Sequence, residues 1–191
     1  MNPTSHPWIR DGISITRALL DSVESHAIEA YGHGLALADS AGDGFEGEEA
    51  CGVLSGPAAS SSEPLAVDEA TRWPNLANRY HRADSEGYPR TGRTYFLIDP
   101  LKFSRAIAAA ETAGRPVKVL YHSHLDCGAY FSETDAATAL AGGEEPAYEL
   151  AFLVVSVRGD GRGGGASVDD RKLFLWDAAG KRFVEGALTI A

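Results

Sequence analysis

The chain has 191 residues, 44% of them hydrophobic and 23% charged, and its 17 Lys and Arg against 27 Asp and Glu give a formal net charge of −10. This composition is typical of a globular protein with one core, and it excludes a peptide-sized scaffold. An acidic balance argues against a nucleic-acid partner, because phosphates require a basic surface. No segment approaches the roughly 20 consecutive apolar residues that a membrane span needs.

Cysteine usage and the first residues indicate the compartment. Cys51 and Cys127 are too few for a disulfide framework and do not form a C-x-x-C pair, as expected in a reducing environment. The first ten residues contain no apolar segment of the kind that a secretory signal requires. We therefore expect a cytoplasmic protein, either an enzyme or an interaction domain.

An amphipathic helix is predicted near the start of the chain. From Ser14 to Tyr31, apolar residues recur every three or four positions, which is the helical period. Gly32 and Gly34 predict the end of this helix. The acidic, glycine-spaced segment 39–49 then predicts a loop.

The remainder of the chain predicts alternating strands and helices. Asp99 as N-cap, Pro100 at the first helical position and Gly114 as terminator predict a second helix. A third helix should begin near Ser132, and the polar stretch 78–94 should be an exposed loop. Strands are predicted at 50–55, 65–71, 116–121, 148–157, 172–176 and 181–185, with a turn at 159–165. We expect a single α/β (α+β) domain over 1–191, with its core at about 13–185 and helices flanking a central mixed sheet.

The strongest chemical signal is a pair of histidines where a predicted strand ends. Because strand side chains alternate, His122 and His124 project from one face and can bind one metal ion, while Ser123 faces the other side and supports the fold. By itself, such a pair is also found as two polar residues at a strand exit. Ser132 and Asp135 follow in the pattern H-S-H-x7-S-x-x-D, which arises by chance on the order of once in a thousand such sequences.

Ser132 and Asp135 also have a structural interpretation. A serine followed three residues later by an acid, before an alanine-rich helical run, is a capping box. Capping and metal binding are compatible, since a first-turn carboxylate can face a cation. Both interpretations stay open at this point.

The pattern H-S-H-x7-S-x-x-D resembles the motif of the JAMM (MPN+) zinc metallopeptidases. The upstream glutamate of that family is matched by Glu49, which opens the segment E-A-C-G-V-L-S-G at 49–56. His26 near the end of the first predicted helix also agrees with the family pattern. The resemblance extends from about Ile13 to Glu185 and implies an MPN/JAB-like fold. The segment 32–48 is longer than the family pattern, so Glu46 and Glu48 are alternatives to Glu49.

The resemblance also implies a mechanism. His122, His124 and Asp135 would bind one Zn²⁺ per chain and leave a fourth position for water, which is the catalytic arrangement. Zinc acidifies that water, Glu49 would act as general base, and Ser132 would hydrogen-bond the tetrahedral oxyanion.

Family members cut peptide or isopeptide bonds after the C-terminal Gly-Gly of ubiquitin-like proteins, and compact bacterial relatives process sulfur-carrier proteins. The resemblance therefore implies a hydrolase that takes such a carrier's C-terminal tail, which an edge strand beside the metal can bind by strand addition. The alternative is a non-catalytic scaffold of the same fold, which the intact ligand set argues against. A DNA-associated relative fits poorly with the net charge of −10. The oligomeric state is not indicated by the sequence.

Residues outside the motif can be explained by packing or solvation as well as by function. Tyr130 and Phe131, next to Ser132, are expected to pack and could line a cleft. The arginines of the predicted 78–94 loop could contact an acidic partner surface or be a solvated part of the loop. These arginines are Arg79, Arg82, Arg90 and Arg93.

Overall fold

The computed structural model of the protein describes residues 6–41, 47–160 and 165–191. The helices are α1 (Trp8–Asp11), α2 (Arg17–Ala41), α3 (Ala77–Ala83), α4 (Pro100–Thr112) and α5 (Glu133–Leu140). The strands are β1 (Ile13–Ile15), β2 (Cys51–Ser55), β3 (Ala66–Val67), β4 (Glu69–Trp73), β5 (Val117–Leu125), β6 (Ala151–Gly159), β7 (Ala166–Asp177), β8 (Arg182–Gly186) and β9 (Leu188–Ile190). Within these ranges, no helix is long and apolar enough to cross a membrane.

A six-stranded mixed sheet forms the centre of the molecule, in the order β4-β2-β5-β6-β7-β8. Strands β5 and β6 pair in parallel, and the other neighbours in this sheet pair antiparallel. The short strands β3, β1 and β9 form a second, parallel sheet. The mixed α/β fold expected from the sequence is therefore confirmed.

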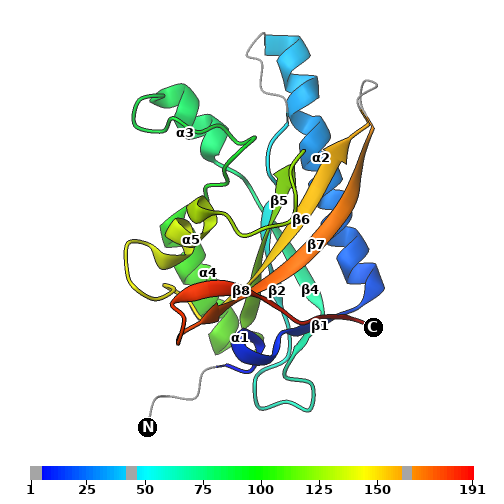
Figure 1. Cartoon of the computed structure of the whole chain (residues 1–191), viewed down its shortest axis with the longest axis vertical. Coiled ribbons are helices and arrows are strands. Elements are labelled where there is room, and N and C mark those ends of the chain that lie inside the picture. Colours follow the sequence, from blue (N-terminus) through cyan, green and yellow to red (C-terminus); the bar gives the residue numbers. More distant parts are fainter. Residues whose placement is uncertain (1–5, 42–46, 161–164) are drawn as a thin grey trace.

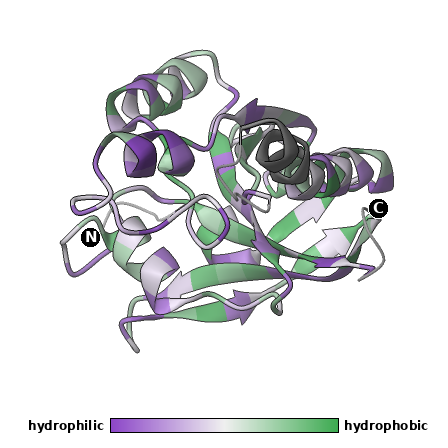
Figure 2. Cartoon of the chain, turned by 90° about the horizontal axis from the view of Figure 1, so that it is seen from above, coloured by the Kyte–Doolittle hydropathy of each residue, from purple (hydrophilic) through white to green (hydrophobic). Residues whose placement is uncertain are grey.

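Helices cover both faces of the large sheet (Figure 1). The long helix α2 packs on one face through Leu20, Val23 and Ala27, in a cluster of buried apolar side chains. The other face carries α4 and α5, where Phe103 belongs to a second apolar cluster. All nine residues of β5 are buried between these layers. Figure 2 shows the central strands mostly as hydrophobic and the hydrophilic residues mainly on helices and loops.

The helix predicted from its end signals is confirmed as α4. The Asp99 carboxylate accepts hydrogen bonds from the backbone N–H groups of Leu101 and Lys102, at 3.0 and 2.9 Å. Pro100 occupies the first helical position. Gly114 follows the helix with a φ of 69°, the left-handed conformation that glycine adopts without strain.

Some element boundaries predicted from the sequence are wrong. Helix α2 does not end at Gly32 but continues through Gly34 to Ala41. Each interior glycine costs roughly 1 kcal/mol, but Leu35, Ala36, Leu37 and Ala38 after the glycines are strong helix formers. The predicted loop 78–94 begins as helix α3, and the predicted strand 65–71 is divided into β3 and β4. Parts of the predicted acidic loop (42–46) and of the predicted turn (161–164) lie outside the described residues.

Gly52 lies on β2 directly opposite Tyr121 of β5. A Cβ atom at this position would clash with the Tyr121 hydroxyl and lie 2.5 Å from the Thr71 carbonyl oxygen. The hydroxyl cannot easily move, because it is within hydrogen-bond distance of His26 Nδ1, at 2.9 Å. The glycine in the E-x-x-G segment therefore makes room for a buried tyrosine.

Replacing Gly52 with alanine is expected to lower the free energy of unfolding by about 1–3 kcal/mol, since the added methyl overpacks the core. The matched control is Gly32→Ala on α2, where nothing lies within 4 Å of an added Cβ. This control is expected to raise stability by about 0.5–1 kcal/mol, because glycine inside a helix is unfavourable. Urea unfolding of both variants measures the two effects, and a Gly52→Ala protein as stable as the unmodified chain would contradict the clash.

Candidate metal centre

Strand β5 and the start of α5 bring three metal-binding side chains together. His122 Nε2 lies 3.2 Å from His124 Nε2 and 3.3 Å from Asp135 Oδ1. His124 Nε2 lies 3.4 Å from Asp135 Oδ2. All three residues are buried, and their ligand atoms lie within 4.8 Å of one another.

This donor set fits a cation. When both histidines carry their proton on Nδ1, the two Nε2 lone pairs and the Asp135 carboxylate converge on one point. An ion that accepts the lone pairs of both nitrogens and of Asp135 satisfies the three groups at once. Two nitrogen ligands and one oxygen ligand suit Zn²⁺, with a fourth tetrahedral position left over. The residues that the sequence singled out, His122, His124 and Asp135, are therefore suitable zinc ligands.

Asp135 is positioned by the capping box of α5. Ser132 Oγ accepts a hydrogen bond from the Asp135 backbone N–H at 3.1 Å, and Asp135 Oδ2 accepts one from the Ser132 backbone N–H at 2.8 Å. The capping prediction is confirmed, and the same carboxylate faces both histidines. Burial alone would raise the pKa of Asp135, but His122 and His124 outweigh it and hold that pKa below its ordinary value. The carboxylate is therefore charged at neutral pH.

The two imidazole rings are held in place by their neighbours. Phe96 stacks on His122 with ring centroids 4.7 Å apart, and Tyr130 meets His124 edge-on at 4.9 Å. His124 Nδ1 lies 3.0 Å from the Gly128 carbonyl oxygen. Burial lowers the pKa of His122, which favours the neutral form that binds metals.

Glu49 lies beside the histidines because of the β2–β5 register. Ser123 clamps the intervening residue: its N–H donates to the Ala50 carbonyl at 2.9 Å, and its Oγ accepts from the Ala50 N–H at 2.8 Å. Extending the pairing of Cys51 with His122 by two residues places Glu49 opposite His124. Ser123 thus supports the fold from the opposite face, as expected.

The Glu49 side chain is only 5% exposed. Burial raises the pKa of its carboxyl well above the ordinary value, the negative charge of Asp135 raises it further, and Arg90 opposes the increase. A carboxyl with a raised pKa holds a proton more readily, which suits a group that must accept one.

Two asparagines that the sequence did not single out fix the backbone around Glu49. Asn75 Nδ2 donates to the carbonyl oxygens of Glu49 and Tyr95, both at 3.0 Å. Asn78 Nδ2 donates to Glu48 Oε2 at 3.2 Å, so this neighbouring glutamate is tied to α3. No local pattern in the sequence marks them, because these contacts join residues that are 20, 26 and 30 positions apart. The other alternative glutamate, Glu46, lies outside the described residues.

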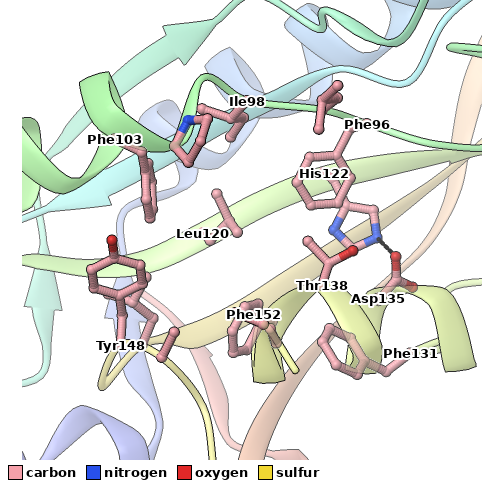
Figure 3. A pocket seen from close by; sticks show the side chains of 16 residues that line it. Phe96, Ile98, Phe103, Leu120, His122, Phe131, Asp135, Thr138, Tyr148 and Phe152 are labelled. Carbon is pink, nitrogen blue, oxygen red and sulfur yellow. Dashed lines mark ion pairs between the residues drawn. The ribbon is translucent and has the colours of Figure 1, made fainter. Parts of the chain in front are cut away.

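An apolar pocket adjoins the candidate metal centre, with a volume of about 310 Å³. His122 and Asp135 form one part of its wall, and the rest comes from β5, β6, α4, α5 and the loops that precede α4 and flank α5 (Figure 3). Phe131 lines this pocket, as the sequence suggested for a cleft. Its aromatic and aliphatic lining includes Phe96, Phe103, Leu120, Phe131, Tyr148 and Phe152.

The arginines of the 78–94 segment have different surroundings. Arg93 forms an ion pair with Asp126, with Nη2 and Oδ2 2.7 Å apart. Arg90 lines a groove of about 470 Å³ together with Tyr95, just after this segment, and Thr134 of α5. Of these two, Arg90 is the better placed to meet a partner that approaches the site.

Comparisons with known proteins concern the family and the fold of the chain. A family model described as prokaryotic homologs of the JAB domain matches residues 34–169. Among solved structures, a protein from Desulfitobacterium hafniense is 20% identical with a TM-score of 0.57, and one from Salinibacter ruber is 21% identical with a TM-score of 0.53. Each similarity covers 94% of this chain and 92% of the other, and at these identities it shows the fold alone. No curated protein matches the chain.

Proposed function

Because the chain belongs to the prokaryotic JAB-domain family, we propose that it is a zinc-dependent peptidase. It hydrolyses a peptide or isopeptide bond after the C-terminal Gly-Gly of a ubiquitin-like or sulfur-carrier protein. The observation that carries this proposal is the convergence of His122, His124 and Asp135 beside the buried carboxyl of Glu49. A ligand set with an open position and a nearby base is the arrangement that hydrolysis requires.

Each side chain has a separate role in this proposal. Zn²⁺, when bound by His122, His124 and Asp135, supplies a Lewis acid that acidifies water and polarises the scissile carbonyl. Glu49 takes the proton of the attacking water and passes it to the leaving amine. Ser132 Oγ already accepts a hydrogen bond from the Asp135 N–H, so its own O–H is available to donate to the developing oxyanion.

The aromatic neighbours of the ligands support a substrate with glycine at the cleavage point. Phe96 stacks on His122 and Tyr130 lies edge-on to His124. These rings narrow the space beside the ligands, so a main chain without side chains can approach most closely. A Gly-Gly terminus offers such a main chain.

The test is incubation of the zinc-loaded protein with ubiquitin-like and sulfur-carrier proteins that carry a short peptide after Gly-Gly. Mass spectrometry is expected to find one new C-terminus, at the second glycine. A chelator should stop the cleavage and added zinc should restore it. Failure to cleave any extended carrier would end the proposal, and protein purified without chelator but free of zinc would favour a non-catalytic scaffold.

A further inference from the structure

The apolar pocket beside the metal centre is larger than the gaps between well-packed side chains. Protein interiors contain few voids larger than a water molecule, whereas this one holds about 310 Å³. It begins at His122 and Asp135 and follows α5 past Thr138 and Ala139. A group bound at the metal could therefore extend directly into it.

The wall of the pocket also contains a hydrogen-bonding group without a protein partner. Among the described residues, none hydrogen-bonds to His122 Nδ1, although the His122 side chain is fully buried. Figure 3 shows one ring nitrogen turned to Asp135 and the other turned to the pocket side, towards Leu120. When Nε2 binds a metal, Nδ1 carries the proton and is a donor.

His124 and His122 differ in the hydrogen bonding of their Nδ1 atoms. Metal-binding histidines ordinarily donate their other N–H to a carbonyl or a carboxylate. His124 follows this rule, with Nδ1 3.0 Å from the Gly128 carbonyl oxygen. His122 Nδ1 has no such acceptor within the described residues, so an acceptor brought by a ligand would complete its hydrogen bonding.

We propose that this pocket is a specificity site that binds a large apolar side chain from the residue following the scissile bond. The inference rests on the proposed function, because the glycine that supplies the scissile carbonyl has no side chain to offer. The residue on the leaving side is then the one nearest the cut whose side chain can fill the pocket. Aromatic and aliphatic walls suit a side chain of the size of leucine or phenylalanine, and His122 Nδ1 offers one hydrogen bond to an acceptor of that residue.

The first test compares carriers that differ only in the residue after Gly-Gly. The unmodified protein is expected to cleave a phenylalanine-extended carrier with a kcat/KM about 10-fold or more above that of an alanine-extended one, because filling an apolar pocket discriminates on this scale. Ala139→Leu narrows the pocket. It should remove this preference, so that the phenylalanine-extended carrier is cleaved no faster than the alanine-extended one.

The matched control is Ala109→Leu, the same change on the exposed face of α4, away from the pocket. It should keep the preference for phenylalanine. Thermal unfolding verifies that both variants are folded. Equal cleavage of the two carriers by the unmodified protein, or an Ala139→Leu variant that keeps the preference, would overturn the pocket assignment and leave the peptidase proposal intact.

A binding measurement separates the pocket from catalysis altogether. Short peptides that begin with phenylalanine or with glycine represent the leaving product, and they are titrated into the zinc-loaded protein by NMR. The phenylalanine peptide is expected to shift the methyl signals of Thr138 and Ala139 and to bind about 10-fold more tightly than the glycine peptide. Equal binding of the two peptides would overturn the inference. This test does not depend on cleavage, so it stands even if no carrier is cleaved and the proposed function fails.

Discussion

Glu49→Gln is expected to lower kcat/KM on an extended carrier by about 10²–10⁴-fold, which is the usual contribution of a general base. Glutamine has nearly the same shape but cannot accept a proton from water. The zinc content should remain one ion per chain, because the three proposed ligands are His122, His124 and Asp135. Steady-state kinetics and elemental analysis on the same preparations measure both quantities.

The adjacent glutamate provides a matched control. Glu48 accepts a hydrogen bond from Asn78 Nδ2, a contact that glutamine can keep through its carbonyl oxygen. Glu48→Gln is therefore expected to retain activity within about 3-fold of the unmodified protein, in line with the small effects of most surface substitutions. Full activity in Glu49→Gln, or an equal loss in Glu48→Gln, would show that Glu49 is not the base.

Local rules predicted some parts of the fold well. Helix α4 could be located because Asp99, Pro100 and Gly114 act on their immediate neighbours, and each does so in the structure. The end of α2 could not be located, because Gly32 and Gly34 ordinarily end a helix whereas the strong helix formers at 35–38 continue this one to Ala41. Strands β1 and β9 carry no local signal at all, since three residues near each end of the chain pair in parallel.

Some residues of the candidate site could likewise be predicted from local patterns, and others could not. His122, His124 and Asp135 could be selected from their spacing, because strand alternation and helix capping are both local. Asn75 and Phe96 could not be selected, because their contacts with Glu49 and His122 join segments that meet only in the folded chain. The sequence therefore identified the groups proposed to bind zinc and move protons, but not those that hold them in place.

Asp135→Asn is expected to weaken zinc binding by more than about 100-fold. Loss of an outer-shell partner of a metal ligand already costs 10–100-fold in affinity, and Asp135 is a proposed ligand that faces both His122 and His124. Asparagine keeps one carbonyl oxygen for the Ser132 N–H, so the cap of α5 is retained. Zinc affinity should therefore fall while the unfolding temperature measured without metal changes by only a few degrees.

A competition titration with a chromogenic chelator measures the affinity, and circular dichroism measures unfolding. The control is Glu133→Gln, which removes a carboxylate from the first turn of the same helix but from an exposed position. It should leave zinc binding unchanged. If Asp135→Asn binds zinc as tightly as the unmodified protein but unfolds much earlier, the carboxylate serves the helix cap alone and the proposed metal centre lacks its third ligand.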